Sequence, residues 1–301
     1  MDRSYSNKRS LPRTTAATEV YGVLGWPVAH SLSPLIHSLA ISRQGLDAVY
    51  LALPVEPSVL GAALEGLDSI GARGLNVTAP HKQEVMAHLA GLTDLAAGLG
   101  SVNCIFRGPD GSLHGDNTDM EGILAAISAN PKAGPLEGTA VVLGAGGASA
   151  SAVGAVSRLG ARHVAVMGRR QDRVKALLDR LESSGLCRTT TLEAVPLDAR
   201  EPVLRSASAI VQATSAPPDG PPPIDPCSLP ESSLVVDMIY GPGRDGGTRF
   251  LDLARRRGMT TVDGLSILAW QAAFSWERWV GEELDKAAVE AMLDAARNHQ
   301  K

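Results

Sequence analysis

The feature that most constrains the fold is a glycine-rich turn between an apolar segment and a helical one. Residues 139–143 read TAVVL, which is typical of a buried strand, and residues 144–149 read GAGGAS. In dinucleotide-binding α/β folds, glycines at this point permit a tight turn and let the backbone approach a pyrophosphate at the helix N-terminus. The alternative is a plain strand-to-helix turn. We predict a dinucleotide site that includes Gly144, Gly146, Gly147 and Ala148.

The segments that follow this turn alternate between strand and helix patterns. Strands are predicted at 163–167, 209–213 and 234–238, and helices at 150–159 and 172–183. Residues 216–223 contain five prolines, which predicts an irregular loop after a strand. This rhythm is typical of a doubly wound, Rossmann-type sheet.

The N-terminal half carries a second set of alternating elements. Strands are predicted at 21–24, 48–53, 74–77 and 102–106. Ser33 and Pro34 predict a helix start, with the serine as N-cap and the proline at the first helical position. Asn117 opens another helix, which runs to about Asn130. Such alternation predicts a mostly parallel sheet with helical crossovers.

The order of these elements, with a linker of proline and glycine at 131–138, predicts an α/β protein of two domains. We expect a flexible tail over residues 1–18 and an α/β substrate-binding domain over residues 19–119. Helices within 264–301 complete that domain. The Rossmann-type dinucleotide-binding domain occupies residues 120–263.

Composition excludes several classes of function. The 301 residues carry a formal net charge of −4, and no basic run is mixed with aromatic residues, which argues against nucleic acid as a partner. No apolar stretch approaches the ~20 residues that span a membrane. The three cysteines lack metal-ligand spacing, so we expect reduced thiols and no metal. We expect a cytoplasmic protein whose partner is a small molecule.

A cluster of arginines distinguishes between the two nicotinamide dinucleotides. An NAD-binding fold usually supplies an acid about 20 residues beyond the glycines to bind the ribose hydroxyls. Here residues 169–173 read RRQDR. Guanidinium groups pair bidentately with a 2′-phosphate, so the segment favours NADP, bound by Arg169, Arg170 and Arg173. Asp172 keeps NAD open as the alternative.

Several ordered motifs together resemble one family. In the N-terminal half they are residues 25–34 (GWPVAHSLSP), 74–82 (GLNVTAPHK), 102–103 (VN) and 115–122 (GDNTDMEG). Further matches follow at 144–149, 213–215 (ATS), 237–240 (DMIY), 263–265 (DGL) and 271–272 (QA). These motifs resemble the shikimate dehydrogenase family, over nearly the whole chain from about residue 20 to residue 283.

The resemblance implies a reversible, NADPH-dependent reduction of 3-dehydroshikimate to shikimate in aromatic amino-acid biosynthesis, by a monomer or a homodimer. It matches Lys82 and Asp119 to the family's catalytic pair. Chemistry agrees, because negative charge builds on the ketone oxygen when hydride reaches the carbon, and a proton donor or cation must be waiting there. Taken singly, Lys82 could be an exposed lysine at a helix start, and Asp119 an acid favoured by a helix dipole.

The resemblance also assigns binding residues. Ser31 and Ser33 hydrogen-bond the substrate carboxylate, and Tyr240 assists at that end. The ring hydroxyls are held by Thr78, Asn103 and Gln271. On the cofactor side, the matched motifs add Thr214 and Gly264. The family pattern gives His30 and His37 no proton-transfer role, so we interpret both as structural, or as hydrogen-bond donors behind the residues that contact the substrate.

Two other functions stay open at this point. A quinate or aminoshikimate dehydrogenase of the same family would differ only around the residues that hold the ring hydroxyls. A non-catalytic module that senses a nucleotide or another ligand could share the fold, because a fold does not determine a function. Retention of both Lys82 and Asp119 argues against such a sensor. The chain departs from the family at Gln212 and at residues 216–218, which affects the loop near the nicotinamide.

Overall fold

The residues that the computed structural model describes, 14–241 and 247–300, contain two six-stranded sheets. In spatial order the N-terminal sheet consists of β2 (Ala48–Pro54), β1 (Glu19–Gly25), β3 (Gly74–Val77), β5 (Cys104–Arg107), β6 (Leu113–Asp116) and β4 (Gly91–Leu92). All neighbours pair in parallel except β5, which is antiparallel to β3 and to β6. A short turn with Gly111 at a φ of 81° joins β5 to β6, so no crossover helix intervenes. The predicted mostly parallel sheet is confirmed, with β5 as the exception.

The second sheet is parallel throughout. Its order is β12 (Thr260–Val262), β11 (Leu234–Asp237), β10 (Ala207–Gln212), β7 (Gly138–Leu143), β8 (Ala161–Met167) and β9 (Thr191–Ala194). This is the Rossmann arrangement, in which the strand order reverses between β7 and β10. Residues 140–143 of β7 are all buried, as expected for a strand covered by helices on both faces. The predicted Rossmann-type doubly wound unit is confirmed.

Helices cover both sheets. The N-terminal sheet has α1 (Ser33–Gln44), α2 (Leu60–Ser69) and α3 (Asp94–Leu99), and the second has α5 (Gly147–Arg158), α6 (Gln171–Ser184), α7 (Glu201–Arg205) and α8 (Arg249–Arg256). Short 3₁₀ turns lie at η1 (Pro57–Val59), η2 (Glu84–His88) and η3 (Pro226–Ser228). Among the described helices, none is long and apolar enough to cross a membrane.

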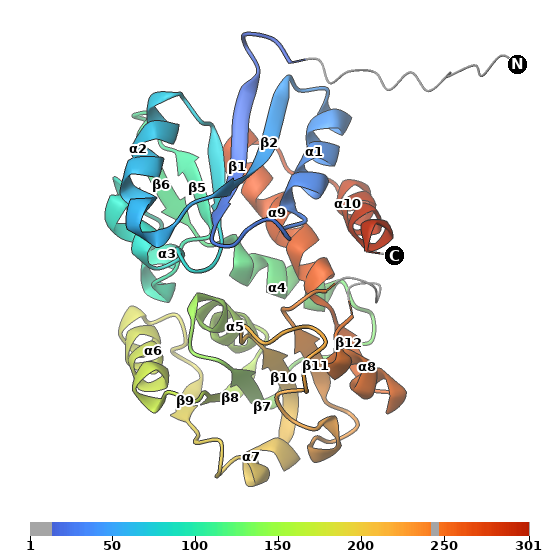
Figure 1. Ribbon diagram of the computed structural model, residues 1–301. Helices are drawn as coiled ribbons and strands as arrows, with labels where there is room; N and C mark the ends of the chain where they lie inside the picture. The colour runs from blue at the N-terminus through green and yellow to red at the C-terminus, as the bar shows by residue number, and fades with distance from the viewer. Residues whose placement is uncertain (1–13, 242–246, 301) are drawn as a thin grey trace, which may run out of the picture.

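Two helices lie between the sheets, α4 (Thr118–Ser128) and α9 (Gly264–Val280), and Figure 1 shows both in the middle of the molecule. The last helix, α10 (Lys286–His299), packs beside α1. Its Met292 shares a buried apolar cluster with Ile36 of α1 and Trp276 of α9. The C-terminal helices therefore contribute to the core of the N-terminal sheet.

Helices α4 and α9 approach each other very closely at Gly122. A Cβ added there would lie 2.7 Å from Cβ of Gln271, 2.9 Å from its backbone nitrogen and 3.0 Å from the oxygen of Ile267. Backbone atoms cannot move aside as a flexible side chain can, so only glycine fits. This approach brings the first turn of α4 beside the residues of α9 that face it.

Several predicted boundaries differ from the structure. The N-cap of α1 is Leu32, so Ser33 is the first helical residue and not the cap, and no side chain caps this helix. The helix after the glycine turn begins at Gly147, three residues earlier than predicted, because the turn itself enters the helix. The C-terminal helices predicted within 264–301 are α9 and α10, and Gly281 ends α9 in a left-handed conformation.

Part of the predicted flexible tail lies outside the described residues, namely residues 1–13. The remainder is attached to the protein. The hydroxyls of Thr15 and Thr18 each donate a hydrogen bond to the carboxylate of Asp47, both at 2.5 Å. These bonds place Thr15 and Thr18 beside Asp47, and the flexibility of the tail stays a prediction.

The close approach at Gly122 predicts a stability effect. Gly122→Ala should lower the free energy of unfolding by about 1–3 kcal/mol, because the added methyl group forces α4 and α9 apart. Gly66→Ala on exposed α2 is the matched control. A Cβ there meets nothing within 4 Å, so this change should raise stability by up to ~1 kcal/mol. Denaturant unfolding of both variants checks this, and a Gly122→Ala protein as stable as wild type would contradict the tight crossing.

Candidate active site

A cavity of about 210 Å³ lies between the two sheets, beyond the carboxyl ends of β3, β10 and β11. Ligands of open α/β sheets bind at these strand ends. All the predicted catalytic and substrate-binding residues line it, namely Ser31, Ser33, Thr78, Lys82, Asn103, Asp119, Tyr240 and Gln271. Residues more than 200 positions apart in the sequence therefore converge on one cavity.

Lys82 and Asp119 form an ion pair in this cavity. The Lys82 Nζ donates to Oδ2 of Asp119 at 2.5 Å, and the two side chains are 20% and 10% exposed. Lys82 lies in the turn after β3, where its carbonyl accepts a hydrogen bond from the backbone N–H of Val102 at 2.8 Å. Asp119 lies in the first turn of α4. A largely buried pair at this distance is more than a surface lysine and a helix-start acid.

The side chain of Asn103 holds Asp119 from the other side. Its Nδ2 lies 2.8 Å from Oδ1 of Asp119 and 3.1 Å from Oε1 of Gln271. Its Oδ1 accepts a hydrogen bond from the backbone N–H of Thr118 at 2.7 Å. Asn103 is only 2% exposed, so water competes little for these bonds. One amide thus orients both the acid of the pair and the amide of α9.

Asn76, to which no sequence motif assigned a role, also lines the cavity. Its Nδ2 donates to Oγ of Ser275 at 2.9 Å and to the carbonyl of Asn103 at 3.1 Å, and its Oδ1 accepts from the hydroxyl of Tyr50 at 2.7 Å. A signal was present, because Asn76 is the one polar side chain in the four-residue strand 74–77. A buried amide needs partners and therefore marks a polar site.

Three hydroxyl groups gather at another part of the cavity. The backbone N–H of Ser33 donates to Oγ of Ser31 at 3.2 Å. Burial raises the pKa of Tyr240, while hydrogen bonds to the backbone at Leu32 and to the Ser31 side chain lower it. Hydroxyls that stay protonated can donate hydrogen bonds to an anion such as a carboxylate.

The loop that carries Tyr240 is held by Asp237, the last residue of β11. The carboxylate of Asp237 accepts from Oγ1 of Thr248 at 2.6 Å and from the backbone N–H of Ile239 at 3.0 Å. Burial raises the pKa of Asp237 to about 6, and these two hydrogen bonds act in the opposite direction. The bonds hold the start of the segment 238–240, which lines the cavity.

His37 and His30 lie outside the cavity lining. The ring of His37 is fully buried and stacks on Tyr50 with centroids 4.3 Å apart. Burial lowers its pKa to about 3, so His37 is neutral at physiological pH. His30 is exposed. The placement of His37 supports its interpretation as a packing residue.

The predicted cofactor residues divide into two groups. Ala148, Thr214 and Gly264 line the same cavity as Lys82. The glycine turn lies close by, because a Cβ added at Gly147 would lie 2.4 Å from Oγ of Ser101 and 3.6 Å from Cβ of Lys82.

The shape of the glycine turn suits a pyrophosphate. Gly144 has a φ of 119°, which other residues rarely adopt, and a Cβ there would lie 2.9 Å from the carbonyl oxygen of Ala213. A Cβ on Gly146 would meet nothing within 4 Å, so the turn faces open space at the N-terminus of α5. Free N–H groups at a helix start bind anions.

The predicted arginines lie outside the cavity lining, at the start of α6. Nη2 of Arg170 donates to Oδ2 of Asp172 at 2.6 Å, and its Nε lies 3.3 Å from Oδ1. Both side chains are exposed, so this pair is worth little to stability. The pair does engage Asp172, the acid of this segment that could otherwise bind the ribose hydroxyls of NAD. Among the described residues, none makes a hydrogen bond or ion pair with Arg169.

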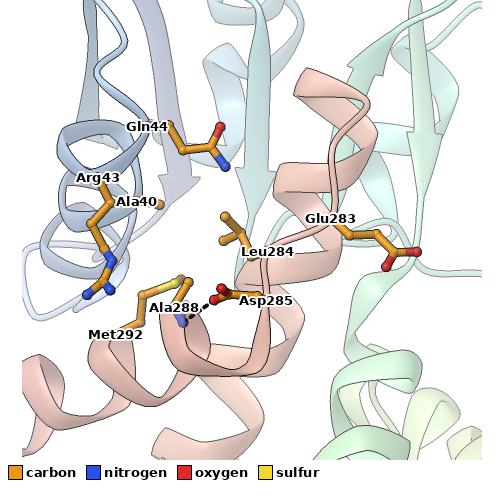
Figure 2. Close-up of a pocket in the computed structure, with 8 residues that line it drawn as sticks. All are labelled: Ala40, Arg43, Gln44, Glu283, Leu284, Asp285, Ala288 and Met292. Atoms are coloured by element: carbon orange, nitrogen blue, oxygen red, sulfur yellow. Dashed lines mark hydrogen bonds between the residues drawn. The ribbon is translucent and has the colours of Figure 1, made fainter.

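A second cavity, of about 250 Å³, lies between α1 and the start of α10 (Figure 2). Its lining includes Arg43, Glu283 and Met292. In Figure 2 the one hydrogen bond drawn joins Asp285 to Ala288, which is the N-cap bond of α10. None of the predicted site residues lies there. Of the polar side chains that line this cavity, Asp285 caps α10.

Models of two protein families match the chain. The shikimate dehydrogenase substrate-binding domain matches residues 23–105, and the shikimate / quinate 5-dehydrogenase family matches residues 129–219. The shikimate dehydrogenase (NADP⁺) of Synechocystis sp. is 35% identical over 295 residues, covering 96% of this chain and 98% of the relative.

Solved structures agree with these matches. The shikimate 5-dehydrogenase of Thermus thermophilus, in complex with NADP(H) and shikimate, has a TM-score of 0.79 and 35% identity, over 93% of this chain and 99% of its own. The quinate dehydrogenase of Corynebacterium glutamicum, in complex with NAD, has a TM-score of 0.83 and 26% identity, over 93% and 99%.

Proposed function

The chain belongs to the shikimate dehydrogenase family, and we propose that it carries out its reaction at the Lys82–Asp119 pair. It is an NADP-dependent oxidoreductase that interconverts 3-dehydroshikimate and shikimate. The observation that carries the site assignment is the 2.5 Å contact between Lys82 Nζ and Asp119 Oδ2 inside the inter-sheet cavity.

The pair acts as one proton-exchanging unit. When bound, the nicotinamide supplies the hydride exchange at the ring carbon. In the reducing direction the ammonium of Lys82 faces the ketone oxygen, stabilises the charge that develops there and provides a proton. In the oxidising direction the pair takes that proton back. Asp119 keeps the lysine in place, and Asn103 keeps Asp119 in place.

The remaining lining residues orient the substrate. The hydroxyls of Ser31, Ser33 and Tyr240 donate hydrogen bonds to the carboxylate of shikimate. The side chains of Thr78, Asn103 and Gln271 face the ring hydroxyls and present the reacting one to Lys82. Holding both ends of a small ring fixes which hydroxyl reacts, because orientation lowers the entropic part of the barrier.

The glycine turn and the arginine segment would hold NADP. Gly144, Gly146, Gly147 and Ala148 receive the pyrophosphate, and Thr214 and Gly264 border the nicotinamide. Arg169 and its neighbours Arg170 and Arg173 bind the 2′-phosphate. The Arg170–Asp172 pair supports this assignment, because an acid already engaged by a guanidinium no longer repels the phosphate.

Substrate binding and cofactor binding are assigned to different parts of the chain. Residues 19–119 and 264–301 bind the substrate, and residues 120–263 bind NADP. The protein acts in the cytoplasm, as a monomer or a homodimer, with shikimate and 3-dehydroshikimate as its small-molecule partners.

The first functional prediction concerns the pair. Lys82→Ala and Asp119→Asn should each lower kcat for shikimate oxidation by at least ~100-fold and change KM much less, because both groups act mainly in the transition state. Assays with shikimate and with quinate, under saturating NADP, measure this. Near-normal turnover of Lys82→Ala would remove the lysine from the mechanism, and a wild type that oxidises only quinate would move the protein to the other branch of the family.

The second functional prediction concerns cofactor choice. Arg169→Ala should raise the KM for NADP by at least ~10-fold, since a hydrogen bond to a charged group is worth about 1.5–3 kcal/mol, and should barely change the KM for NAD. Arg162→Ala is the matched control, because Arg162 is exposed at the opposite end of β8. Equal losses with NADP and NAD would contradict a 2′-phosphate contact.

A further inference from the structure

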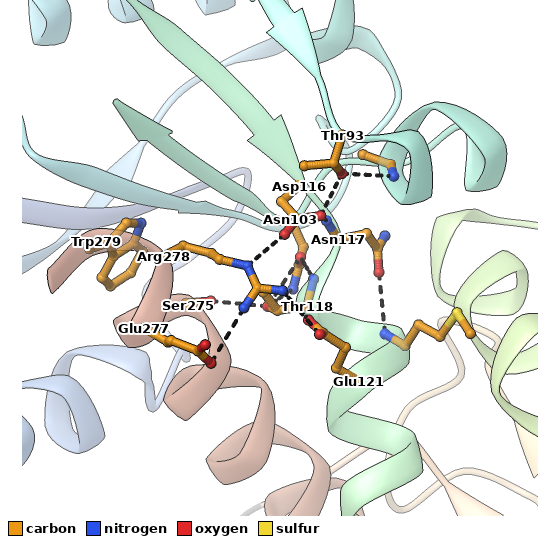
Figure 3. A network of polar contacts seen from close by, with 12 residues as sticks. Thr93, Asn103, Asp116, Asn117, Thr118, Glu121, Ser275, Glu277, Arg278 and Trp279 are labelled. Carbon is orange, nitrogen blue, oxygen red and sulfur yellow. Dashed lines mark hydrogen bonds and ion pairs between the residues drawn. The ribbon is translucent and has the colours of Figure 1, made fainter. Parts of the chain in front are cut away.

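A second ion network lies beside the active-site pair, centred on Arg278 of α9 (Figure 3). Nε of Arg278 donates to Oδ2 of Asp116 at 2.8 Å. Its Nη2 donates to both carboxylate oxygens of Glu121, at 3.0 Å and 2.8 Å. A longer contact of 3.5 Å reaches Glu277. One guanidinium therefore joins the end of β6 and the first turns of α4 to α9.

The two main partners of Arg278 flank the residues that form the site. Asp116 ends β6 and Glu121 lies in α4, so Asn117, Thr118 and Asp119 lie between the two fixed points. On α9 itself, Arg278 lies one turn beyond Ser275, whose hydroxyl contacts that of Thr118 at 3.0 Å. The network therefore spans the turn that presents the acid of the pair.

Asp116 is fixed from a second direction as well. Its Oδ1 accepts from the hydroxyl of Thr93 at 2.6 Å and from the backbone N–H of Asn117 at 2.7 Å. Asp116 is 3% exposed, so its charge has little water around it. Both carboxylate oxygens of Asp116 therefore accept hydrogen bonds. The bond from Asn117 also fixes the backbone of the turn before Asp119.

Without Arg278 this arrangement would hold two negatively charged carboxylates that repel each other. The carboxylates of Asp116 and Glu121 share one guanidinium. The Asp116 side chain is 4% exposed, against 29% for Glu121, so removal of the cation leaves the buried charge of Asp116 uncompensated. Burial raises the pKa of Glu121, while Arg278 lowers it. Loss of the guanidinium therefore drives Glu121 away from Asp116, which displaces the first turn of α4.

We propose that Arg278 is a positioning residue, which keeps Asp119 in contact with Lys82 by joining both flanks of the β6–α4 turn to α9. This inference rests on the proposed role of the Lys82–Asp119 pair. Arg278 does not line the cavity, so as a positioning residue it acts through Asp119. Its effect should therefore appear in the chemical step.

Kinetics of the full chain test this proposal. Arg278→Met should lower kcat for shikimate oxidation by at least about tenfold and leave the KM for NADP within about twofold, because small displacements of reacting groups are costly. The isotope effect on kcat, measured with shikimate deuterated at the carbon that loses hydride, should increase. Arg278→Lys should recover part of the loss, since it restores the charge without the bidentate bond.

The matched control is Arg107→Met. Arg107 also bonds a carboxylate at 2.8 Å and has nearly the same side-chain exposure, 23% against 24%, but it lies at the other end of β5 from the site. Its kcat should stay within about twofold of wild type when thermal melting shows both variants folded at the assay temperature. A purely structural Arg278 would lower the melting temperature and leave kcat and the isotope effect unchanged, and that result would overturn the proposal.

Two further variants keep the test decisive. Adding Glu121→Gln to Arg278→Met should raise kcat by about threefold or more, because it removes the repulsion, and no recovery would count against the mechanism. If Arg278→Met fails to fold, Asp116→Asn replaces it. That variant keeps the bonds to Thr93 and Asn117 but loses its charge, and normal kcat would overturn the proposal. Lys82→Ala in the same assay separates the two claims, since an active Lys82→Ala protein means that the proposed catalytic pair itself is wrong.

Discussion

Two neighbouring residues, Val102 and Asn103, hold both members of the ion pair, and the rest of the site depends on them. The backbone N–H of Val102 bonds the carbonyl of Lys82, and the amide of Asn103 bonds the carboxylate of Asp119. The lysine and the acid therefore meet because one short segment before β5 fixes each of them. A pair built on long side chains alone would lose most of its Coulomb energy to conformational entropy. Here the backbone bond at Lys82 and the buried amide of Asn103 hold the two residues in place.

The second constraint is the crossing of α4 and α9. Gly122 allows the two helices to meet at backbone distance, which places Gln271 beside Thr118 and Asp119. The same crossing brings Arg278 to the β6–α4 turn. Both helices lie between the sheets (Figure 1), so Asp119 lies where the N-terminal sheet and the second sheet face each other. The geometry of the pair and the packing of the two halves are therefore set by the same contacts.

Much of this arrangement follows from local patterns in the sequence. The strand 139–143 and the glycine turn predict the Rossmann unit, and the motifs around Lys82 and Asp119 predict which residues converge. Features that depend on residues far away in the sequence cannot be predicted from local patterns. Ser33 has the residue type of an N-cap, yet Leu32 occupies that position, and Ser33 is buried beside the cavity. The partners of Arg278 lie 157 and 162 positions away, and an arginine in an amphipathic helix looks like a surface residue until the helices pack. Strands β4 and β12 have only two and three residues, too few to show a periodicity.

The most direct test of the account is a crystal structure of the protein with NADP⁺ and shikimate. We predict the reacting ring hydroxyl within about 3.2 Å of Lys82 Nζ or the Asp119 carboxylate, the range in which a proton can be exchanged directly. We also predict the carboxylate of shikimate at Ser31 and Ser33, and the 2′-phosphate at Arg169. A reversed substrate, with its carboxylate on Lys82 and no hydroxyl near Asp119, would contradict the proposed chemistry.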